Sequence, residues 1–291
     1  SLDCITELGE AQVYGYTPNE QVAEHIGDAD AVICNKCLIT DEVFEKCPNL
    51  KYVGLFATGY NNVDIQSAKA HGAVVCNVPA YSTNAVAQLT FSLILEITNA
   101  VGIHSESVRN GDWANCPDFC YWKTPLTELC DKTLGIVGFG QIGQAVADIA
   151  EAFKMKVNAV SGHETDQSHR NNFSWVDMDT LAKTSDIISF HCPLTEKTTG
   201  LVNKDFIDKC KDGAIIINTS RGPVVNDKDL ADALNNGKLR GAGLDVLTVE
   251  PPKADNPLLS AKNCFITPHI AWAGFETRER LMNILKEKIN I

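Results

Sequence analysis

The sequence predicts an α/β protein with two domains, the larger of them built on a doubly wound parallel sheet. Short apolar segments alternate with helical patterns nearly throughout, which is typical of parallel strands joined by crossover helices. The length of 291 residues favours two domains, at roughly 150 residues per domain. Hydrophobic residues make up 44% and charged residues 21%, an ordinary globular composition. Such a chain buries enough apolar surface to need neither a disulfide nor a metal staple.

The first part of the chain predicts a small α/β domain. Its apolar segments at 29–34, 52–55 and 73–76 are predicted strands. Helical patterns at 41–46 and 63–71 separate these strands. An open sheet with crossover helices is therefore expected here.

A long helix is expected over residues 82–109. Ser82 or Thr83 is a suitable N-cap, and Gly111 ends the pattern. The helix is more apolar than one buried face requires, so we expect it to pack against the symmetry-related helix of a second copy in a homodimer. A loop rich in Pro, Trp and Cys follows at 113–125.

The rest of the chain predicts a second α/β series, and six strands separated by helices describe a complete dinucleotide-type sheet. Further helices are expected at both ends, over 1–9 and 274–291. We therefore expect a substrate domain formed by 1–80 and 270–291 and a dinucleotide-binding domain formed by 81–269. The six predicted strands are 133–137, 156–160, 187–190, 214–218, 241–245 and 264–267.

Charge and hydropathy exclude two classes of partner. Acidic residues outnumber basic ones by 37 to 25, which gives a net charge of −12. A phosphate backbone would be repelled across most of the surface, so nucleic acid is not expected as a partner. The longest apolar runs fall far short of the ~20 residues that a membrane-spanning helix needs. No membrane span is expected.

The cysteines indicate a reducing compartment. The chain has 11 of them, an odd number, and no charged and apolar leader opens the sequence. Reduced thiols in the cytoplasm are therefore expected. Cys34 and Cys37 have C-x-x-C spacing, but a zinc site would need a second such pair, so no metal is expected. Redox or metal chemistry at this pair is the open alternative.

A glycine motif predicts dinucleotide binding. Gly138, Gly140 and Gly143 form G-x-G-x-x-G between the strand at 133–137 and a helical run at 144–153, which is the context the motif requires. The first glycine permits the tight turn, the second lets the backbone approach a pyrophosphate, and the third lets helix and strand pack closely. The pyrophosphate would lie at the helix N-terminus, where free amides and the helix dipole favour an anion.

The next strand leaves the choice between NAD and NADP open. An acidic residue usually holds the adenosine ribose at its tip, whereas the strand at 156–160 ends in Ser161. A 2′-phosphate is therefore admissible, but no arginine lies at the tip to attract it, the nearest being Arg170. Glu164 and Asp166 lie close by and disfavour the phosphate. NAD is the expected cofactor, with NADP as the alternative.

Three further strands are each followed by a group suited to reducing a 2-oxo acid. Arg221 follows one strand, Asp245 and Glu250 follow a second, and His269 follows a third. Open α/β sheets bind ligands at the carboxyl ends of their strands, and a guanidinium fork suits a carboxylate. Each group alone has a structural alternative, as a surface ion pair, a turn residue or a structural histidine. Together, on the side of the glycine loop, they favour a catalytic site.

The sequence resembles the D-isomer-specific 2-hydroxyacid dehydrogenases over nearly the whole chain. Within that family it is most similar to the glycerate dehydrogenase and hydroxypyruvate reductase branch, because of the Ala-Thr-Gly-Tyr-Asn-Asn run from Ala57 and the Trp that follows His269-Ile-Ala. The resemblance implies that the smaller domain is flavodoxin-like. Besides the glycine loop, it rests on the segments 57–64, 77–83, 191–195, 218–222 and 267–272.

The resemblance also implies a role for each catalytic residue. Arg221 matches the arginine that grips the substrate carboxylate and carbonyl oxygen, and His269 matches the general acid/base. Glu250 matches the carboxylate paired with that histidine, where it would orient the imidazole and favour its protonated form. Amides of a glycine-containing turn would receive the substrate carboxylate, and an indole would cap the site. The substrate-binding residues implied are Thr58, Gly59, Arg221 and Trp272.

The cofactor site implied by the resemblance extends over several strand ends. Asp245 matches the residue that contacts the nicotinamide carboxamide, and the loop after the strand at 187–190 lies beside the adenosine half. Ser161 is a departure, because many members of the family carry Asp there. The cofactor-binding residues implied are Gly138, Gly140, Gln141, Ile142, Gly143, Ser161, Cys192, Pro193, Thr198, Thr219, Ser220 and Asp245.

The function expected is therefore the reduction of a small 2-oxo acid, hydroxypyruvate or glyoxylate, to the D-2-hydroxy acid with NADH. Two alternatives remain open. One is the same chemistry on another 2-oxo acid or with NADPH. The other is a cofactor-sensing regulatory protein on the same scaffold, the class to which the C-terminal-binding-protein corepressors belong. Activity with a panel of 2-oxo acids separates them.

Overall fold

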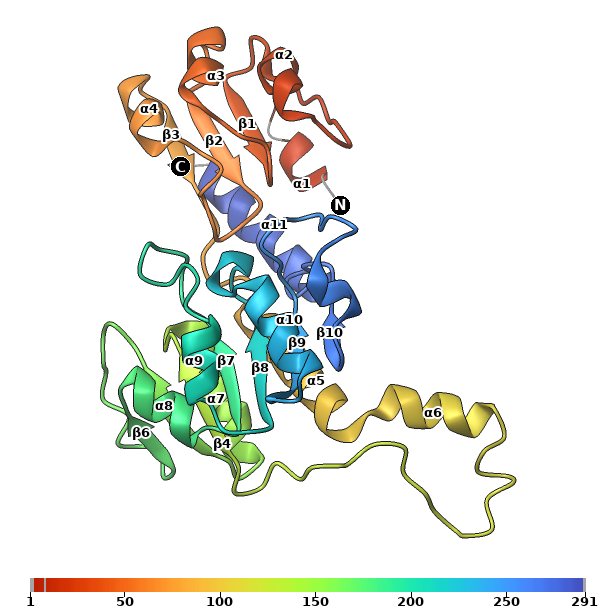
Figure 1. The fold of residues 1–291 in the computed structure, drawn as a ribbon. Helices are drawn as coiled ribbons and strands as arrows, with labels where there is room; N and C mark the ends of the chain where they lie inside the picture. Colours follow the sequence, from red (N-terminus) through yellow and green to blue (C-terminus); the bar gives the residue numbers. More distant parts are fainter. Residues whose placement is uncertain (1–2, 8, 290–291) are drawn as a thin grey trace. The chain divides into compact units, whose positions relative to one another are not determined.

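The structure, a computed structural model, describes residues 3–7 and 9–289. They form two compact units, one drawn from Ser1–Ser82 and Ala273–Ile291 and the other from Thr83–Trp272. Both units are built on parallel sheets with crossover helices (Figure 1). The predicted α/β class is thereby confirmed.

The first unit contains a three-stranded parallel sheet in the order β1-β2-β3. Phe44, Leu50 and Val53 are almost fully buried in its core. Asp64 caps α4, because its carboxylate accepts the amides of Gln66 and Ser67. The elements between the first and last strands are β1 (Ala31–Cys34), α3 (Asp41–Lys46), β2 (Tyr52–Leu55), α4 (Ile65–Ala70) and β3 (Val74–Cys76).

The ends of the chain contribute helices to the same unit. The helix expected over 1–9 is a short α1, and of its predicted residues Ser1, Leu2 and Leu8 lie outside the described part. The helix expected over 274–291 is present as α11, with residues 290–291 outside the described part. These elements and two that the sequence did not predict are α1 (Asp3–Thr6), η1 (Asn19–Gln21), α2 (Val22–Ile26) and α11 (Phe275–Ile289).

The second unit contains a seven-stranded parallel sheet in the order β10-β9-β8-β7-β4-β5-β6. The six strands from β6 to β9 have the doubly wound dinucleotide-binding order, and β10 is added beside β9 at the edge of the sheet. Six strands were predicted, and the seventh, β6, was missed because it is three residues long and follows a polar stretch. The strands are β4 (Thr133–Val137), β5 (Lys156–Val160), β6 (Phe173–Trp175), β7 (Ile187–Phe190), β8 (Ala214–Asn218), β9 (Leu239–Leu244) and β10 (Cys264–Ile266).

Helices pack against this sheet in two separate hydrophobic clusters. One contains Ile94 of α5 and Val146 of α7, and the other contains Leu181 of α8 and Leu230 of α10, all of them completely buried. The sheet is therefore covered on both faces, as a doubly wound fold requires. The helices are α5 (Thr83–Asn99), α6 (Val101–Arg109), α7 (Gln141–Ala152), α8 (Met178–Thr184), α9 (Lys204–Lys209), α10 (Asp227–Asn235) and the short η2 (Gly222–Val224) and η3 (Pro257–Ser260).

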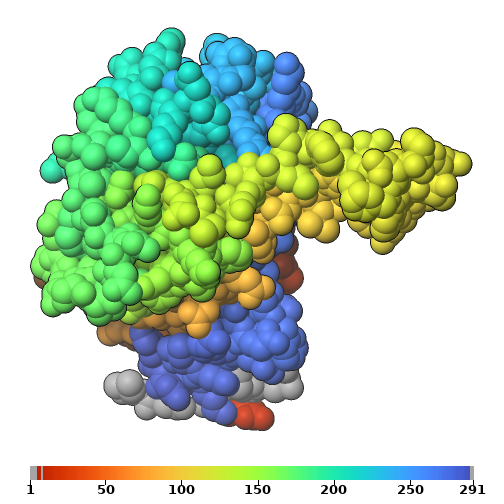
Figure 2. Space-filling model, turned by 90° about the horizontal axis from the view of Figure 1, so that it is seen from below, coloured from red at the N-terminus to blue at the C-terminus, as the bar shows by residue number. Residues whose placement is uncertain are grey.

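The prediction of a single long helix over 82–109 is wrong. The helix breaks at Ala100, whose φ of 48° lies in the left-handed region, and α5 and α6 meet at a bend of 55°. Gly102 weakens the helix at this point, and a β-carbon there would lie 3.2 Å from a carboxylate oxygen of Glu96. Figure 2 shows α6 and the loop that follows it extending away from the rest of their unit.

Among the described residues, no single helix is long and apolar enough to cross a membrane, although the bent pair of α5 and α6 passes the same test when taken together.

Candidate active site

Six predicted site segments leave the sheet of the second unit at a single row. The register pairs the last residues of neighbouring parallel strands with one another across the sheet. These last residues are Val160, Val137, Phe190, Asn218, Leu244 and Ile266. The residues that follow them are Ser161, Gly138, His191, Thr219, Asp245 and Thr267. The sheet therefore brings the glycine loop and the chemistry-bearing segments to the same edge.

The glycine loop has the geometry that a pyrophosphate site requires. Gly138 has a φ of +93°, and a β-carbon there would lie 2.6 Å from the amide nitrogen of Cys192. A β-carbon at Gly143 would lie 2.3 Å from the carbonyl oxygen of Gly138. A β-carbon at Gly140 would instead face open space, with no other heavy atom of the described chain within 4 Å apart from its chain neighbours. Because α7 begins at Gln141 without a side-chain cap from the described residues, its first amides are available to an anion.

Two other predicted cofactor segments lie on this edge. At the end of β5, the hydroxyl of Ser161 accepts the amide of His163 at 3.3 Å. After β7, Cys192 is buried and Pro193 is exposed. Thr198 donates to the carbonyl of Pro193 at 2.7 Å, which closes the loop between them. The structure thus supplies a hydroxyl at the end of β5, where the ribose is predicted to bind, and a closed loop after β7.

His191, to which sequence reasoning assigned no role, is held neutral at this edge. The residue is half-buried, but its ring nitrogen Nδ1 is fully buried and has no hydrogen-bond partner in the described chain. Its Nε2 lies 2.8 Å from the hydroxyl of Ser189. Burial disfavours the charged form and lowers the pKa of His191 to about 3. The ring therefore adds no positive charge near the glycine loop at neutral pH.

A buried asparagine shapes the turn that carries Arg221. The side-chain oxygen of Asn218 accepts the amide and the hydroxyl of Ser220, and its side-chain nitrogen donates to the carbonyl of Arg221. The adjacent hydroxyl of Thr219 lies 3.1 Å from that of Thr90 on α5. Neither Asn218 nor Thr90 was singled out by sequence reasoning.

Arg221 has a guanidinium that is free to bind an anion. Its Nη1 donates to the carbonyl of Ser220 at 2.7 Å, and no carboxylate of the described residues pairs with it. The residue is half-buried, so an anion bound there would be partly shielded from water. A β-carbon at Gly222 would lie 1.8 Å from the carbonyl oxygen of Leu247, which shows how closely the loops after β8 and β9 pack.

Asp245 holds the segment that carries the histidine. The residue is 1% exposed, and its carboxylate accepts the hydroxyl of Thr267 at 2.6 Å and the amides of Ile270 and Ala271 at 2.8 and 2.9 Å. Its carbonyl oxygen accepts the amide of His269 at 2.9 Å. Asp245 therefore anchors the histidine segment, in addition to the cofactor contact that the resemblance implies for it.

His269 and Glu250 form the predicted pair. The Nδ1 of His269 lies 2.7 Å from Oε2 of Glu250, and the other carboxylate oxygen accepts the amide of Leu247 at 3.2 Å. The two side chains are 28% and 32% exposed, so a reactant can reach them. His269 has a φ of 55°, an unfavourable conformation for a residue other than glycine and one that concentrates at functional sites. Trp272 follows, half-buried.

The remaining predicted substrate residues belong to the first unit. Thr58 and Gly59 follow β2, and the Thr58 hydroxyl donates to the carbonyl of Val78 at 2.9 Å. The side chain of Asn77 donates to the carbonyl of Thr58 at 2.7 Å. In the described chain, the amides of Thr58 and Gly59 make no backbone hydrogen bond. Their binding of a substrate carboxylate stays a prediction.

The described residues contain no group of three or more His, Cys, Asp or Glu side chains arranged to hold a metal ion. In the C-x-x-C segment, burial and the neighbouring Cys37 raise the pKa of the Cys34 thiol to about 12. Cys34 therefore stays a thiol of low nucleophilicity at physiological pH.

The doubly wound sheet, the glycine loop and the paired imidazole define an NAD-type oxidoreductase, and known proteins narrow this class. Residues 91–271 match the model of the D-isomer specific 2-hydroxyacid dehydrogenase, NAD binding domain. A hydroxypyruvate reductase of Blautia hydrogenotrophica is 51% identical over 283 residues, which covers 96% of this chain and 88% of that protein. A glycerate dehydrogenase of Methylorubrum extorquens is 36% identical over 276 residues, covering 94% and 85%.

Among solved structures, an acyclic imino acid reductase in complex with NADPH and D-Arg superimposes with a TM-score of 0.88. It is 34% identical, and the match covers 99% of this chain and 91% of that one. The chain therefore belongs to the D-isomer specific 2-hydroxyacid dehydrogenase family. The resemblance found in the motifs is confirmed.

Proposed function

We propose that this protein reduces a small 2-oxo acid, hydroxypyruvate or glyoxylate, to the D-2-hydroxy acid with NADH. The observation that carries the proposal is that the guanidinium of Arg221, which no described carboxylate pairs, and the His269–Glu250 pair follow neighbouring strand ends on the edge that holds the glycine loop. The names of the two relatives, a hydroxypyruvate reductase and a glycerate dehydrogenase, support the choice of substrate.

The bound cofactor would supply the hydride, and the chain's own residues would supply the proton and the electrostatics. Because Nδ1 of His269 faces Glu250, its Nε2 is the nitrogen left to donate a proton to the carbonyl oxygen. Arg221 would bridge the carboxylate and that oxygen, and would stabilise the negative charge that develops there. The same arrangement run backwards oxidises the hydroxy acid.

The substrate assignment is tested by initial rates with hydroxypyruvate, glyoxylate, pyruvate and phenylpyruvate, each with NADH and NADPH. Small acids suit a site that recognises a carboxylate and a carbonyl and is capped by the indole of Trp272. We expect hydroxypyruvate and glyoxylate to give the highest kcat/KM. Good reduction of phenylpyruvate without hydroxypyruvate activity would contradict the substrate assignment. Cofactor binding without any turnover would favour a regulatory protein.

Glu250→Gln should shift the pH dependence of reduction. Glutamine keeps the shape of the side chain but removes the charge 2.7 Å from the imidazole. Reduction needs the protonated imidazole, which loses its counterion, so the pH-rate profile should move toward lower pH. Steady-state rates between pH 5 and 9 measure the shift, with Glu250→Asp as the control that keeps the charge. Coincident profiles for the glutamine variant and the wild type would show that the pairing has no role in proton transfer.

Ser161→Asp should sharpen the preference for NADH. Ser161 can donate to a 2′-hydroxyl but brings no charge to reject a 2′-phosphate, so we propose a modest preference in the wild type. An aspartate repels the phosphate and should lower kcat/KM for NADPH by about tenfold or more. Ser161→Asn, which adds size without charge, is the matched control. A wild-type enzyme that already strongly prefers NADPH would overturn this assignment.

We propose that the chain forms a homodimer through the face of α5. A groove of about 530 Å³ on α5 and α7 is lined by Phe91, Leu95 and Ile149 among others. Beyond α6, Phe119 and Trp122 are 83% and 68% exposed. Large aromatic side chains that are exposed in this way often mark a surface that binds another protein. Analytical ultracentrifugation at micromolar concentration should give about twice the chain mass of 31.7 kDa. A mass near that of one chain would contradict the proposal.

The cytoplasmic location expected from the cysteines stays a prediction. The individual cofactor contacts of Gln141, Ile142 and Ser220 also stay predictions. The assignment of the first unit to the substrate and of the second to the dinucleotide is likewise part of the proposal.

A further inference from the structure

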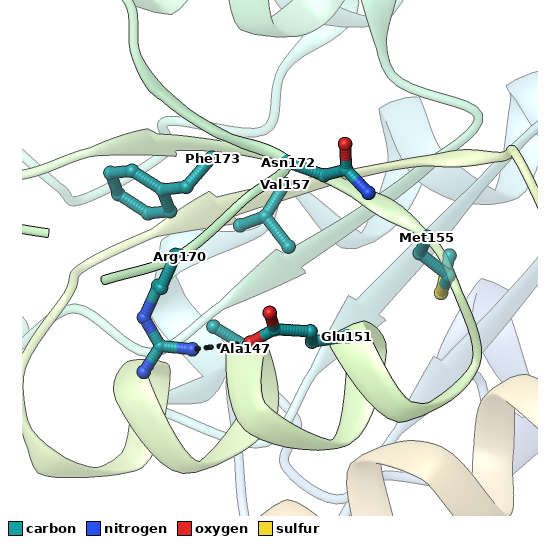
Figure 3. Close-up of a pocket in the computed structure, with 7 residues that line it drawn as sticks. All are labelled: Ala147, Glu151, Met155, Val157, Arg170, Asn172 and Phe173. Atoms are coloured by element: carbon teal, nitrogen blue, oxygen red, sulfur yellow. Dashed lines mark ion pairs between the residues drawn. The ribbon is translucent and has the colours of Figure 1, made fainter. Parts of the chain in front are cut away.

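Arg170 is an almost buried cation with two carboxylate partners. Only 7% of its side chain is exposed, although it lies on the connection between β5 and β6. Its Nη2 lies 2.5 Å from Oδ1 of Asp148 and its Nη1 lies 3.8 Å from Oε2 of Glu151, both on α7. Figure 3 shows the guanidinium lying over α7 and directed toward Glu151. Arg170 therefore fastens the connection between β5 and β6 to the helix that follows the glycine loop.

The same arginine organises its own connection. Its Nε donates to the side-chain oxygen of Gln167 at 2.9 Å, and its amide donates to the carbonyl of Gln167 at 2.9 Å. Gln167 is buried, and its side-chain nitrogen donates to the hydroxyl of Thr165 at 2.9 Å. The carbonyl of Thr165 accepts the indole N–H of Trp175 at 3.2 Å. Hydrogen bonds to Trp175 and Arg170 thus hold residues 165–170, the segment that follows the turn at Ser161.

Arg170 also contacts the glycine loop itself. Its guanidinium carbon lies 5.8 Å from the ring centre of Phe139, the residue between Gly138 and Gly140. The ring of Phe139 packs against those of Phe173 and Trp175, with centres 4.9 and 5.1 Å away. Cation–π and edge-to-face contacts of this kind are directional, so they fix the ring as well as bury it.

We infer that Arg170 is a positioning residue for the adenosine end of the cofactor. It sets the glycine loop and the turn at Ser161 at a fixed separation, so that a dinucleotide meets a preformed site. The inference rests on the proposed cofactor roles of these two segments. A preformed site binds more tightly because less conformational freedom is lost on binding. The two carboxylates neutralise the guanidinium, so Arg170 is not the ligand of a 2′-phosphate.

The test is the affinity of Arg170→Met for ADP-ribose, which carries the pyrophosphate and adenosine but no nicotinamide. Methionine keeps an apolar stem and removes the hydrogen bonds. Isothermal titration should show an ADP-ribose Kd about tenfold higher than that of the wild type. In steady-state kinetics, KM for NADH should rise while kcat at saturating NADH stays unchanged. That split distinguishes lost positioning from general damage to the catalytic groups.

Arg240→Met is the matched control. Arg240 is a partly buried arginine near the amino end of β9, whereas the glycine loop lies at the carboxyl ends of the strands. It donates to Thr127 and to the carbonyl of Pro125. Its loss should leave the ADP-ribose Kd unchanged. If Arg170→Met does not fold, Trp175→Phe keeps an aromatic ring and removes only the hydrogen bond to Thr165, and should raise the Kd by about threefold.

Four outcomes would overturn the inference. An unchanged ADP-ribose Kd in both Arg170→Met and Trp175→Phe, or an equal rise in Arg240→Met, would show that the cluster does not act on the cofactor site. A loss confined to NADPH would show that Arg170 binds the 2′-phosphate directly. If the wild-type protein bound no ADP-ribose, the proposed cofactor site would itself be wrong, and the inference with it.

Discussion

His269→Gln is expected to lower kcat by about 10²- to 10⁴-fold, the usual contribution of a general acid/base. Glutamine is similar in length to histidine and can keep a hydrogen bond to Glu250, but it cannot release a proton at neutral pH. The residue also has a φ of 55°, so a substitution with a side chain leaves the backbone no more strained than before. Rapid-mixing measurement of NADH oxidation with hydroxypyruvate would give the rate of the chemical step directly.

A control separates lost chemistry from lost structure. Because the His269 segment is held by Asp245 through backbone groups and Thr267, the fold of the variant should survive, and its Kd for NADH should match that of the wild type. The pH dependence of the residual rate should also flatten, since the proton donor is gone. A variant with near-normal kcat would remove His269 from the proton-transfer step.

Arg221→Lys is expected to keep NADH binding and to lower kcat by about 10²- to 10³-fold, the effect of removing one oxyanion stabiliser. Lysine preserves the charge but cannot bridge a carboxylate and a carbonyl oxygen with two parallel hydrogen bonds. The structure adds a second reason. Arg221 already uses Nη1 to hold the carbonyl of Ser220, so a planar fork serves the turn and the substrate at once.

The substrate KM separates the two contributions of Arg221. If the guanidinium acts on the carboxylate in the ground state as well as on the developing oxyanion, KM should rise while kcat falls. Lys211→Arg is the control. It also exchanges lysine and arginine, but at an ion pair with Asp186 next to the start of β7, and it should leave both constants unchanged. Wild-type kinetics in Arg221→Lys would remove this residue from the site.

The sequence was sufficient to predict six of the seven strands of the larger unit and the residues that follow them. Gly138, Arg221 and His269 all lie one to three residues beyond an apolar strand, and a parallel sheet brings such positions together whatever the loops do. The pairing of His269 with Glu250 was predicted from the resemblance, because 19 residues separate them in the chain and no local pattern links them.

Features that depend on distant contacts were not predicted. The hydroxyl contact between Thr90 and Thr219 joins residues 129 positions apart, and Arg170 meets Asp148 across 22 positions. The bend at Ala100 was missed because the apolar pattern of α5 continues toward α6 and only Gly102 marks the change. Propensity and periodicity describe neighbours along the chain, whereas these features are decided by neighbours in space.

The common row of strand ends also limits how this protein can evolve. Insertions beyond the row lengthen a loop and cost little, because loop closure depends only weakly on length. Deleting one residue within β8 would instead turn its alternate side chains to the opposite face and draw Arg221 back by about 3.3 Å. Substrate range can therefore diversify through loop length and composition, while the lengths of β8, β9 and β10 are fixed by the need to keep three reacting groups level.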